Sequence, residues 1–240
     1  MRSLVLTLLI LAGCNFESSD IAINKPLIVL TFDDGSQSIY DLAFPEMQKY
    51  NYPGVNFIPT GFLNYKNKMS LDEALQLEKA GWETGGHTVT HANLTTISLD
   101  SARYEIKTNY EQLIKFGLKH RCFALPAGHT NSEVDAIIHE YFEIIRTSEN
   151  ERYRYPLNVD KLGYYQVEEN DDANSLLMRV THGTNEGECL IIFGFHLFTT
   201  GEPTFLTMIN ISIFREFLQE LYIRNLEVVT LSDAVDRLCK

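Results

Sequence analysis

Two adjacent carboxylates, Asp33 and Asp34, stand between an apolar run and Gly35. The run, residues 27–32, is rich in β-branched residues and does not alternate, which is typical of a strand buried on both faces. Neighbouring carboxylates repel each other, and a cation or a shared proton usually relieves that repulsion. The pattern therefore predicts half of a metal site at a strand end, although taken alone it also fits a turn with solvated charges.

Two histidines four residues apart, His87 and His91, are candidates for the other half of the site. Gly85 and Gly86 precede them, and β-branched residues lie between them, which favours a strand followed by a turn over the middle of a helix. One carboxylate and two imidazoles make three protein ligands and leave a position open for water, as in catalytic metal sites. Two unrelated histidines are the alternative, but the order of the two motifs and their shared place after strand-like runs favour one site.

The rest of the chain alternates strand-like and helix-like segments. A capping box at Ser70 and Glu73 predicts a helix that ends before Gly81. Further helices are expected at residues 98–117, 131–140, 173–184, 212–224 and from 232 onward, and strands at 82–86, 122–125, 142–145, 162–167, 190–195 and 226–229. This alternation predicts a parallel sheet, and the candidate residues fall where its strands end.

Length and composition fit one soluble α/β domain. The chain has 240 residues, with 45% hydrophobic and 22% charged residues. The net charge of −12 makes nucleic acids and anionic membrane surfaces poor partners. Beyond the N-terminal region the cysteines are Cys122, Cys189 and Cys239, an odd number, so at least one is unpaired. The first two open strand-like runs, and we expect them to be buried as small apolar side chains.

The N-terminus has the pattern of an export signal. Arg2 gives one positive charge, and residues 4–12 are apolar apart from Thr7 but too few to span a bilayer. The segment ends in Leu-Ala-Gly before Cys14, which resembles a bacterial lipoprotein signal with Cys14 as the lipidated residue; an ordinary cleaved signal is the alternative. We expect a signal peptide at 1–13, a lipidated tether at 14–25 and a catalytic domain at 26–240. The residue after the cysteine is Asn15, not aspartate, which mildly favours an outer-membrane anchor in the cell envelope.

The segment 31–35 followed by 87–91 resembles the polysaccharide deacetylase family, the chitooligosaccharide deacetylase homology domain of carbohydrate esterase family 4. The similarity extends to segments 56–63, 123–128, 141–147, 191–196 and 227–232, so it covers roughly the whole of 26–240. The resemblance implies a distorted (β/α) barrel of about seven parallel strands, with its site at the C-terminal ends of the strands. It also implies a metal-dependent hydrolase that removes N-acetyl, or O-acetyl, groups from an envelope or extracellular polysaccharide.

The resemblance also implies individual roles. Three side chains would hold a divalent metal ion, with Zn²⁺ as the first choice and Co²⁺ or Ni²⁺ as alternatives: Asp34, His87 and His91. Asp33 would be the general base, and His196 the general acid that protonates the leaving amine. The backbone N–H of Ala127 would stabilise the oxyanion. A buried core histidine is the alternative for His196.

Two positions depart from the family pattern. Ala124 stands where many members have an Arg that pairs with the catalytic Asp; Arg146, at the end of the next strand, could supply that charge or could be a surface residue. Gly194 stands where many members have a Leu that lines the acetyl pocket. A catalytically silent glycan-binding lipoprotein and a hydrolase of another, cyclic amide are therefore alternatives. The sequence leaves open which glycan is bound and which cysteines pair.

Overall fold

The computed structural model describes residues 25–157 and 161–239, so Cys14, the expected signal peptide and nearly all of the expected tether lie outside the described part. Seven parallel strands form one sheet in the order β5-β4-β3-β2-β1-β7-β6. They are β1 (Leu27–Asp33), β2 (Val55–Ile58), β3 (Glu83–Gly86), β4 (Cys122–Ala124), β5 (Ile144–Arg146), β6 (Tyr165–Gln166) and β7 (Leu190–Phe195). The expected number and direction of the strands are confirmed.

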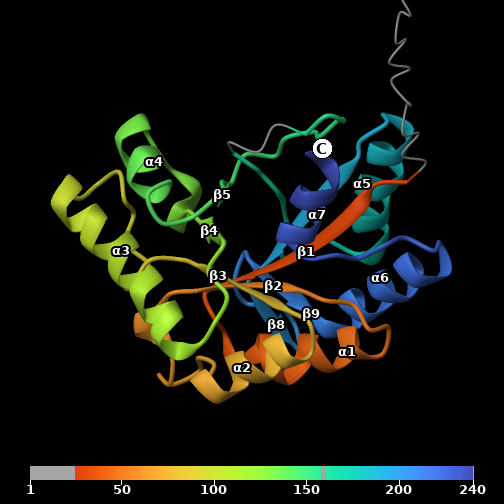
Figure 1. The fold of residues 1–240 in the computed structure, drawn as a ribbon. Helices are drawn as coiled ribbons and strands as arrows, with labels where there is room; N and C mark the ends of the chain where they lie inside the picture. The colour runs from red at the N-terminus through yellow and green to blue at the C-terminus, as the bar shows by residue number, and fades with distance from the viewer. Residues whose placement is uncertain (1–24, 158–160, 240) are drawn as a thin grey trace, which may run out of the picture.

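The segment just before β6 reaches the opposite edge of the sheet and curls it. Leu162 forms an isolated parallel bridge with Arg146 at the end of β5. The Thr147 N–H donates to the Leu162 carbonyl (2.8 Å), and the Leu162 N–H donates to the Ile145 carbonyl (2.9 Å). Because β6 is itself the strand at the other edge, paired with β7, this short segment links the two edges, and the sheet becomes a curled half-barrel (Figure 1).

Helices surround the sheet, with α3 and α4 at one side, α5 and α6 at the other, and α1 and α2 along the bottom of the view in Figure 1. Their bounds are α1 (Phe44–Gln48), α2 (Leu71–Lys79), α3 (Leu99–Phe116), α4 (Ser132–Ile138), α5 (Ala173–Asn185), α6 (Ile211–Ile223) and α7 (Leu231–Leu238), with short turns η1 (Ile39–Ala43), η2 (Thr60–Phe62) and η3 (Pro126–Gly128). The predicted capping box forms at Ser70 and Glu73, and Gly117 ends α3 at φ 76°. Within the described residues, no helix is both long and apolar enough to cross a bilayer.

Both faces of the strands are buried, which explains the unalternating sequence of β1. Ile28, Leu30 and Phe32 pack outward against the helices, whereas Leu27 and Val29 pack into the interior of the half-barrel. Successive side chains of a strand point to opposite faces. The same alternation continues to the strand ends, so every second position there points into the interior, where the site is built.

Several expectations are corrected by the structure. Residues 226–229 form no strand but a single bridge between Ile28 and Val228, because the chain passes β1 only briefly before α7. The strand expected at 142–145 begins at Ile144. Apolar residues spaced along one side of α3 predict that Ile114 is buried, but it is 48% exposed. A two-stranded sheet of β8 (Leu197–Thr199) and β9 (Met208–Asn210) was not expected. The expected burial of Cys122 and Cys189 is confirmed.

Candidate metal centre and catalytic site

Three candidate ligands converge at the C-terminal ends of β1 and β3, which flank β2 in the sheet. Asp34 follows β1 in a left-handed conformation (φ 69°), and His87 follows β3. The Asp34 Oδ1 atom lies 3.1 Å from His91 Nε2 and 3.5 Å from His87 Nε2. All three potential ligand atoms lie within 4.8 Å of one another. The structure therefore brings together the three residues that the sequence predicts as metal ligands.

The chemistry of these donors fits a divalent cation. Four ligands at zinc-like bond lengths of about 2.0–2.2 Å stand roughly 3.3 Å apart, close to the separations found here. The His87 Nδ1–H donates to the Ala124 carbonyl (2.7 Å), because a carbonyl can only accept, which leaves Nε2 as the ring nitrogen that faces Asp34. Burial raises the pKa of Asp34, but hydrogen bonds from the two imidazoles outweigh it and hold that pKa well below its usual range, so Asp34 is a carboxylate. One carboxylate oxygen and two imidazole nitrogens thus face one another, and a bound cation would take the place of the protons shared between them.

The loop between the two histidines is held by α3. Thr88 and His91 are both left-handed, with φ 64° and φ 60°, which is uncommon outside glycine and strained for a β-branched residue. The buried Asn109 donates to the Thr88 carbonyl (2.6 Å). The Glu105 carboxylate accepts from the backbone N–H (2.9 Å) and the hydroxyl (2.7 Å) of Thr90. Sequence reasoning missed both α3 residues, although polar side chains among the apolar positions of the α3 stripe were a signal for them.

Asp33 points into the half-barrel interior and pairs with Arg146. The Arg146 Nη2 atom lies 2.5 Å from Asp33 Oδ2, and only 2% of the Arg146 side chain is exposed. The guanidinium lies over the rings of Phe57 (4.9 Å) and Tyr164 (4.2 Å). Burial alone would lower the pKa of Arg146, but the charge of Asp33 outweighs it and raises that pKa. Arg146 is therefore a buried partner of Asp33 and not a surface residue.

His196 lies on the other side of Asp33. It follows β7, and its Nε2 atom is 3.5 Å from Asp33 Oδ2. Burial lowers the pKa of His196 despite the nearby carboxylates, so the ring is neutral near pH 7. Its Nδ1 atom is buried and has no hydrogen-bond partner among the described residues. The imidazole can therefore exchange a proton with a bound molecule without first breaking a hydrogen bond to Nδ1.

A cavity of about 270 Å³ collects these groups. The predicted site residues that line it are Asp33, Asp34, His87, His91, Ala127 and His196. The backbone of Ala127 is left-handed at φ 57°, and neighbouring η3 residues complete that wall. The cavity is also lined by Ser148, just after β5, and by Tyr164 and Gln166. Sequence reasoning missed Tyr164 and Gln166 because only closure of the sheet brings their segment to the site. Arg146 is not among the lining residues, but it forms an ion pair with Asp33, which lines the cavity.

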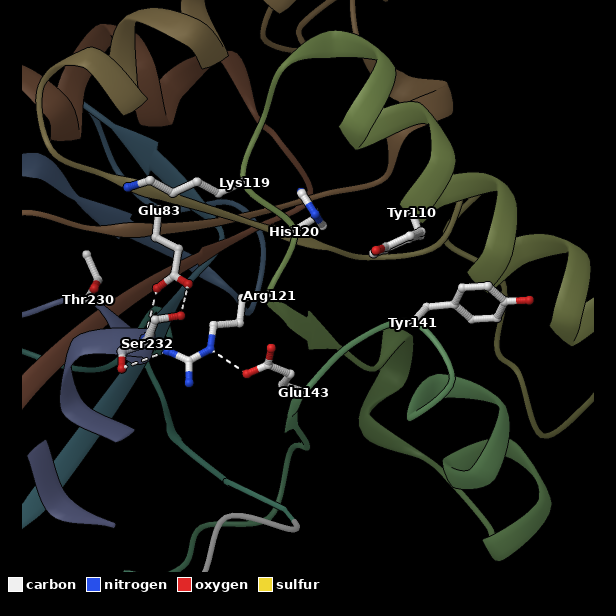
Figure 2. Close-up of a pocket in the computed structure, with 9 residues that line it drawn as sticks. All are labelled: Glu83, Tyr110, Lys119, His120, Arg121, Tyr141, Glu143, Thr230 and Ser232. Atoms are coloured by element: carbon white, nitrogen blue, oxygen red, sulfur yellow. Dashed lines mark hydrogen bonds and ion pairs between the residues drawn. The ribbon is translucent and has the colours of Figure 1, made fainter. Parts of the chain in front are cut away.

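A larger cavity of about 450 Å³ lies at the opposite end of the sheet (Figure 2). Glu83, which lines it, begins β3, whereas the candidate metal ligand His87 follows that strand. The Glu83 carboxylate accepts from the backbone N–H (3.0 Å) and the hydroxyl of Ser232, and so caps α7. Arg121 pairs with Glu143 (2.7 Å). These charged groups already have hydrogen-bond or ion-pair partners. The larger size of this cavity therefore does not make it the candidate catalytic site.

The chain is similar in sequence to deacetylases. A family model described as polysaccharide deacetylase matches residues 21–141. The poly-beta-1,6-N-acetyl-D-glucosamine N-deacetylase of Staphylococcus aureus is 35% identical over 77 residues, which is 30% of this chain and 27% of the relative. That of Staphylococcus epidermidis is 36% identical over 72 residues, or 27% of this chain and 24% of the relative. The similarity thus spans about a quarter of the length of these curated relatives.

Solved structures of low sequence identity share the fold. A Streptococcus pyogenes deacetylase in complex with acetate superposes with a TM-score of 0.57 at 23% identity, covering 63% of this chain and 69% of that one. A peptidoglycan deacetylase from Bacillus subtilis gives a TM-score of 0.62 at 18% identity, with coverages of 89% and 92%. A carbohydrate esterase family 4 pseudoenzyme from Bacillus anthracis gives 0.63 at 19% identity, with coverages of 89% and 66%. Active and inactive proteins therefore share this architecture.

Proposed function

The chain belongs to the polysaccharide deacetylase family, and we propose that it is a metal-dependent hydrolase that removes N-acetyl groups, with O-acetyl groups as the alternative, from an envelope or extracellular polysaccharide. One observation carries the proposal: two functional units meet in a single cavity. The first is the triad of candidate metal ligands, and the second is a carboxylate paired with a buried arginine. A fold kept only for glycan binding has no need of both units.

A divalent metal ion bound by Asp34, His87 and His91 would polarise the acyl carbonyl and lower the pKa of water. Asp33 acts as the general base through Oδ1, which has no hydrogen-bond partner among the described residues, while Arg146 holds Oδ2. The backbone N–H of Ala127 donates to the acyl oxygen as negative charge develops there. Because the resting His196 ring is neutral, it first takes up the proton that Asp33 has removed from water, from a distance of 3.5 Å, and then delivers a proton to the leaving nitrogen.

The substrate most worth testing is poly-β-1,6-N-acetylglucosamine, because the staphylococcal relatives carry that specificity in their names. Peptidoglycan is the second candidate, from the structurally similar Bacillus subtilis enzyme. The experiment measures acetate release from these two polymers, chitin oligomers and acetylated xylan, with Zn²⁺ or Co²⁺ added. Metal-loaded protein that binds a glycan but releases no acetate from any polymer would favour the catalytically silent alternative, of which the Bacillus anthracis pseudoenzyme is an example. Hydrolysis of a cyclic imide instead would favour the other amide class.

Metal content should depend on the two histidines. We expect the purified domain to bind one divalent transition metal, and His87→Ala or His91→Ala to lower its affinity by more than the roughly 10–100-fold typical of losing an outer partner. Metal per protein measured by elemental analysis at matched metal concentrations checks this. His182→Ala, an exposed histidine of α5, is the matched control and should keep full occupancy. Equal occupancy in all four proteins would contradict the assignment of the site.

The N-terminal signal is proposed to anchor the protein in the bacterial cell envelope through lipid on Cys14, with the outer membrane mildly favoured. The apolar segment followed by Leu-Ala-Gly-Cys supports this proposal. We expect full-length protein to fractionate with membranes and to incorporate a labelled fatty acid, and Cys14→Ser to do neither. Cys239→Ser is the control for general loss of a thiol. Equal solubility of wild type and Cys14→Ser, without label in either, would contradict the proposal.

A further inference from the structure

Tyr164 occupies the space that a side chain at position 194 would need. Gly194 lies on β7 beside Gln166 of β6, and a Cβ placed on it would be 2.1 Å from the Tyr164 ring. The Arg146 guanidinium lies over the same ring, 4.2 Å from its centroid. Tyr164 is 5% exposed, so its ring is held in contact with both the β7 backbone and the arginine that pairs with Asp33.

The ring is also one of the few apolar surfaces in the catalytic cavity. Most of the lining residues are the candidate metal ligands, the proton-transfer groups and other polar residues, and the lining residues with apolar side-chain surface are Leu125, Ala127 and Tyr164. In a bound amide, the carbonyl oxygen must face the metal ligands and the Ala127 N–H, and the nitrogen must face His196. The alkyl end of the acyl group then has to lie against the remaining apolar wall.

We propose that Tyr164 forms the wall of the acyl pocket and restricts the acyl group removed by this chain to acetyl, an inference that rests on the proposed function. This position of the Tyr164 ring requires glycine at position 194, because only a residue without a side chain leaves room for the ring. The pocket wall therefore comes from the segment that closes the sheet and not from β7. One extra methylene against a closed apolar wall typically changes kcat/KM about 10–200-fold.

The test compares kcat/KM for N-acetyl, N-propionyl and N-butyryl forms of a β-1,6-linked glucosamine oligomer, with Zn²⁺-loaded protein. We expect wild type to prefer acetyl, Tyr164→Phe to keep that preference because the ring remains, and Tyr164→Ala to raise the butyryl-to-acetyl ratio by about 10–200-fold. Loss of the ring also loosens Arg146, but that lowers the rates for all three acyl groups and cancels in the ratio. A ratio within twofold of wild type in Tyr164→Ala would overturn the proposal.

A reciprocal variant tests the geometry directly. Tyr164→Ala with Gly194→Leu refills the space from β7, and we expect it to restore the preference for acetyl. If Tyr164→Ala does not fold, as judged by circular dichroism and metal content, Tyr164→Leu opens the pocket less and should shift the ratio in the same direction; an unshifted ratio overturns the proposal. Wild type that releases all three acyl groups equally would sink this inference and leave the deacetylase function standing. Wild type that releases none would contradict the proposed function itself.

Discussion

Asp33→Asn is expected to lower kcat by about 10²–10⁴ while the metal stays bound. The amide keeps the size and polarity of the side chain but cannot accept the proton that a general base must take from water. The candidate metal contacts belong to Asp34, whose Oδ1 atom faces both histidines, so the loss at Asp33 leaves those ligands in place. The measurement is kcat for acetate release together with metal per protein on the same preparation.

Asp34→Asn is the matched comparison for the same experiment. It removes a charged ligand, so metal affinity should fall first and added metal should restore part of the activity. Asp33→Asn should therefore keep the metal and lose turnover, whereas Asp34→Asn should lose metal first and regain part of its turnover when metal is added. If Asp33→Asn loses metal and Asp34→Asn keeps it, the two roles are reversed. Unchanged acetate release in both variants would rule out the deacetylase function.

Arg146→Ala should damage both stability and turnover. Arg146 and Asp33 form an ion pair in which 2% and 4% of the side chains are exposed, and removing one partner leaves a buried, uncompensated charge. Such a change typically costs about 3–5 kcal/mol of unfolding free energy. Because Asp33 then loses the group that fixes Oδ2, kcat should fall on the order of 10²-fold, as for misplacement of a catalytic group. Denaturant unfolding and acetate-release kinetics measure the two effects.

Two further variants separate these effects. Arg146→Lys keeps the positive charge but loses the planar group that lies over Phe57 and Tyr164. We therefore expect its unfolding free energy and kcat to lie between those of wild type and Arg146→Ala. Arg121→Ala removes a one-third exposed arginine with its own carboxylate partners, and should cost about 1 kcal/mol or less and leave turnover unchanged. Wild-type stability and kcat in metal-loaded Arg146→Ala would show that the ion pair with Asp33 is dispensable.

The sequence by itself determined the features that depend on local pattern. The buried strand before Asp33, the capping box of α2 and the glycine that ends α3 all follow from residues close together in the chain. The parallel order of the strands follows from the repeated alternation of strands and helices. The convergence of Asp34, His87 and His91 could be predicted as well, because the C-terminal ends of all strands in a parallel sheet lie at the same edge, and only β2 separates β1 from β3.

Only the tertiary structure decided which side chains meet across the half-barrel. Arg146 reaches Asp33 because both lie on interior positions of strands that are not neighbours in the sheet. Tyr164 reaches Gly194 because its segment runs from the bridge with β5 directly into β6, which pairs with β7. Glu105 likewise accepts a hydrogen bond from the loop between His87 and His91 only because α3 packs against that loop. Local patterns specify the period and the ends of an element. Contacts across the interior depend on curvature and closure of the whole sheet, which no single segment encodes.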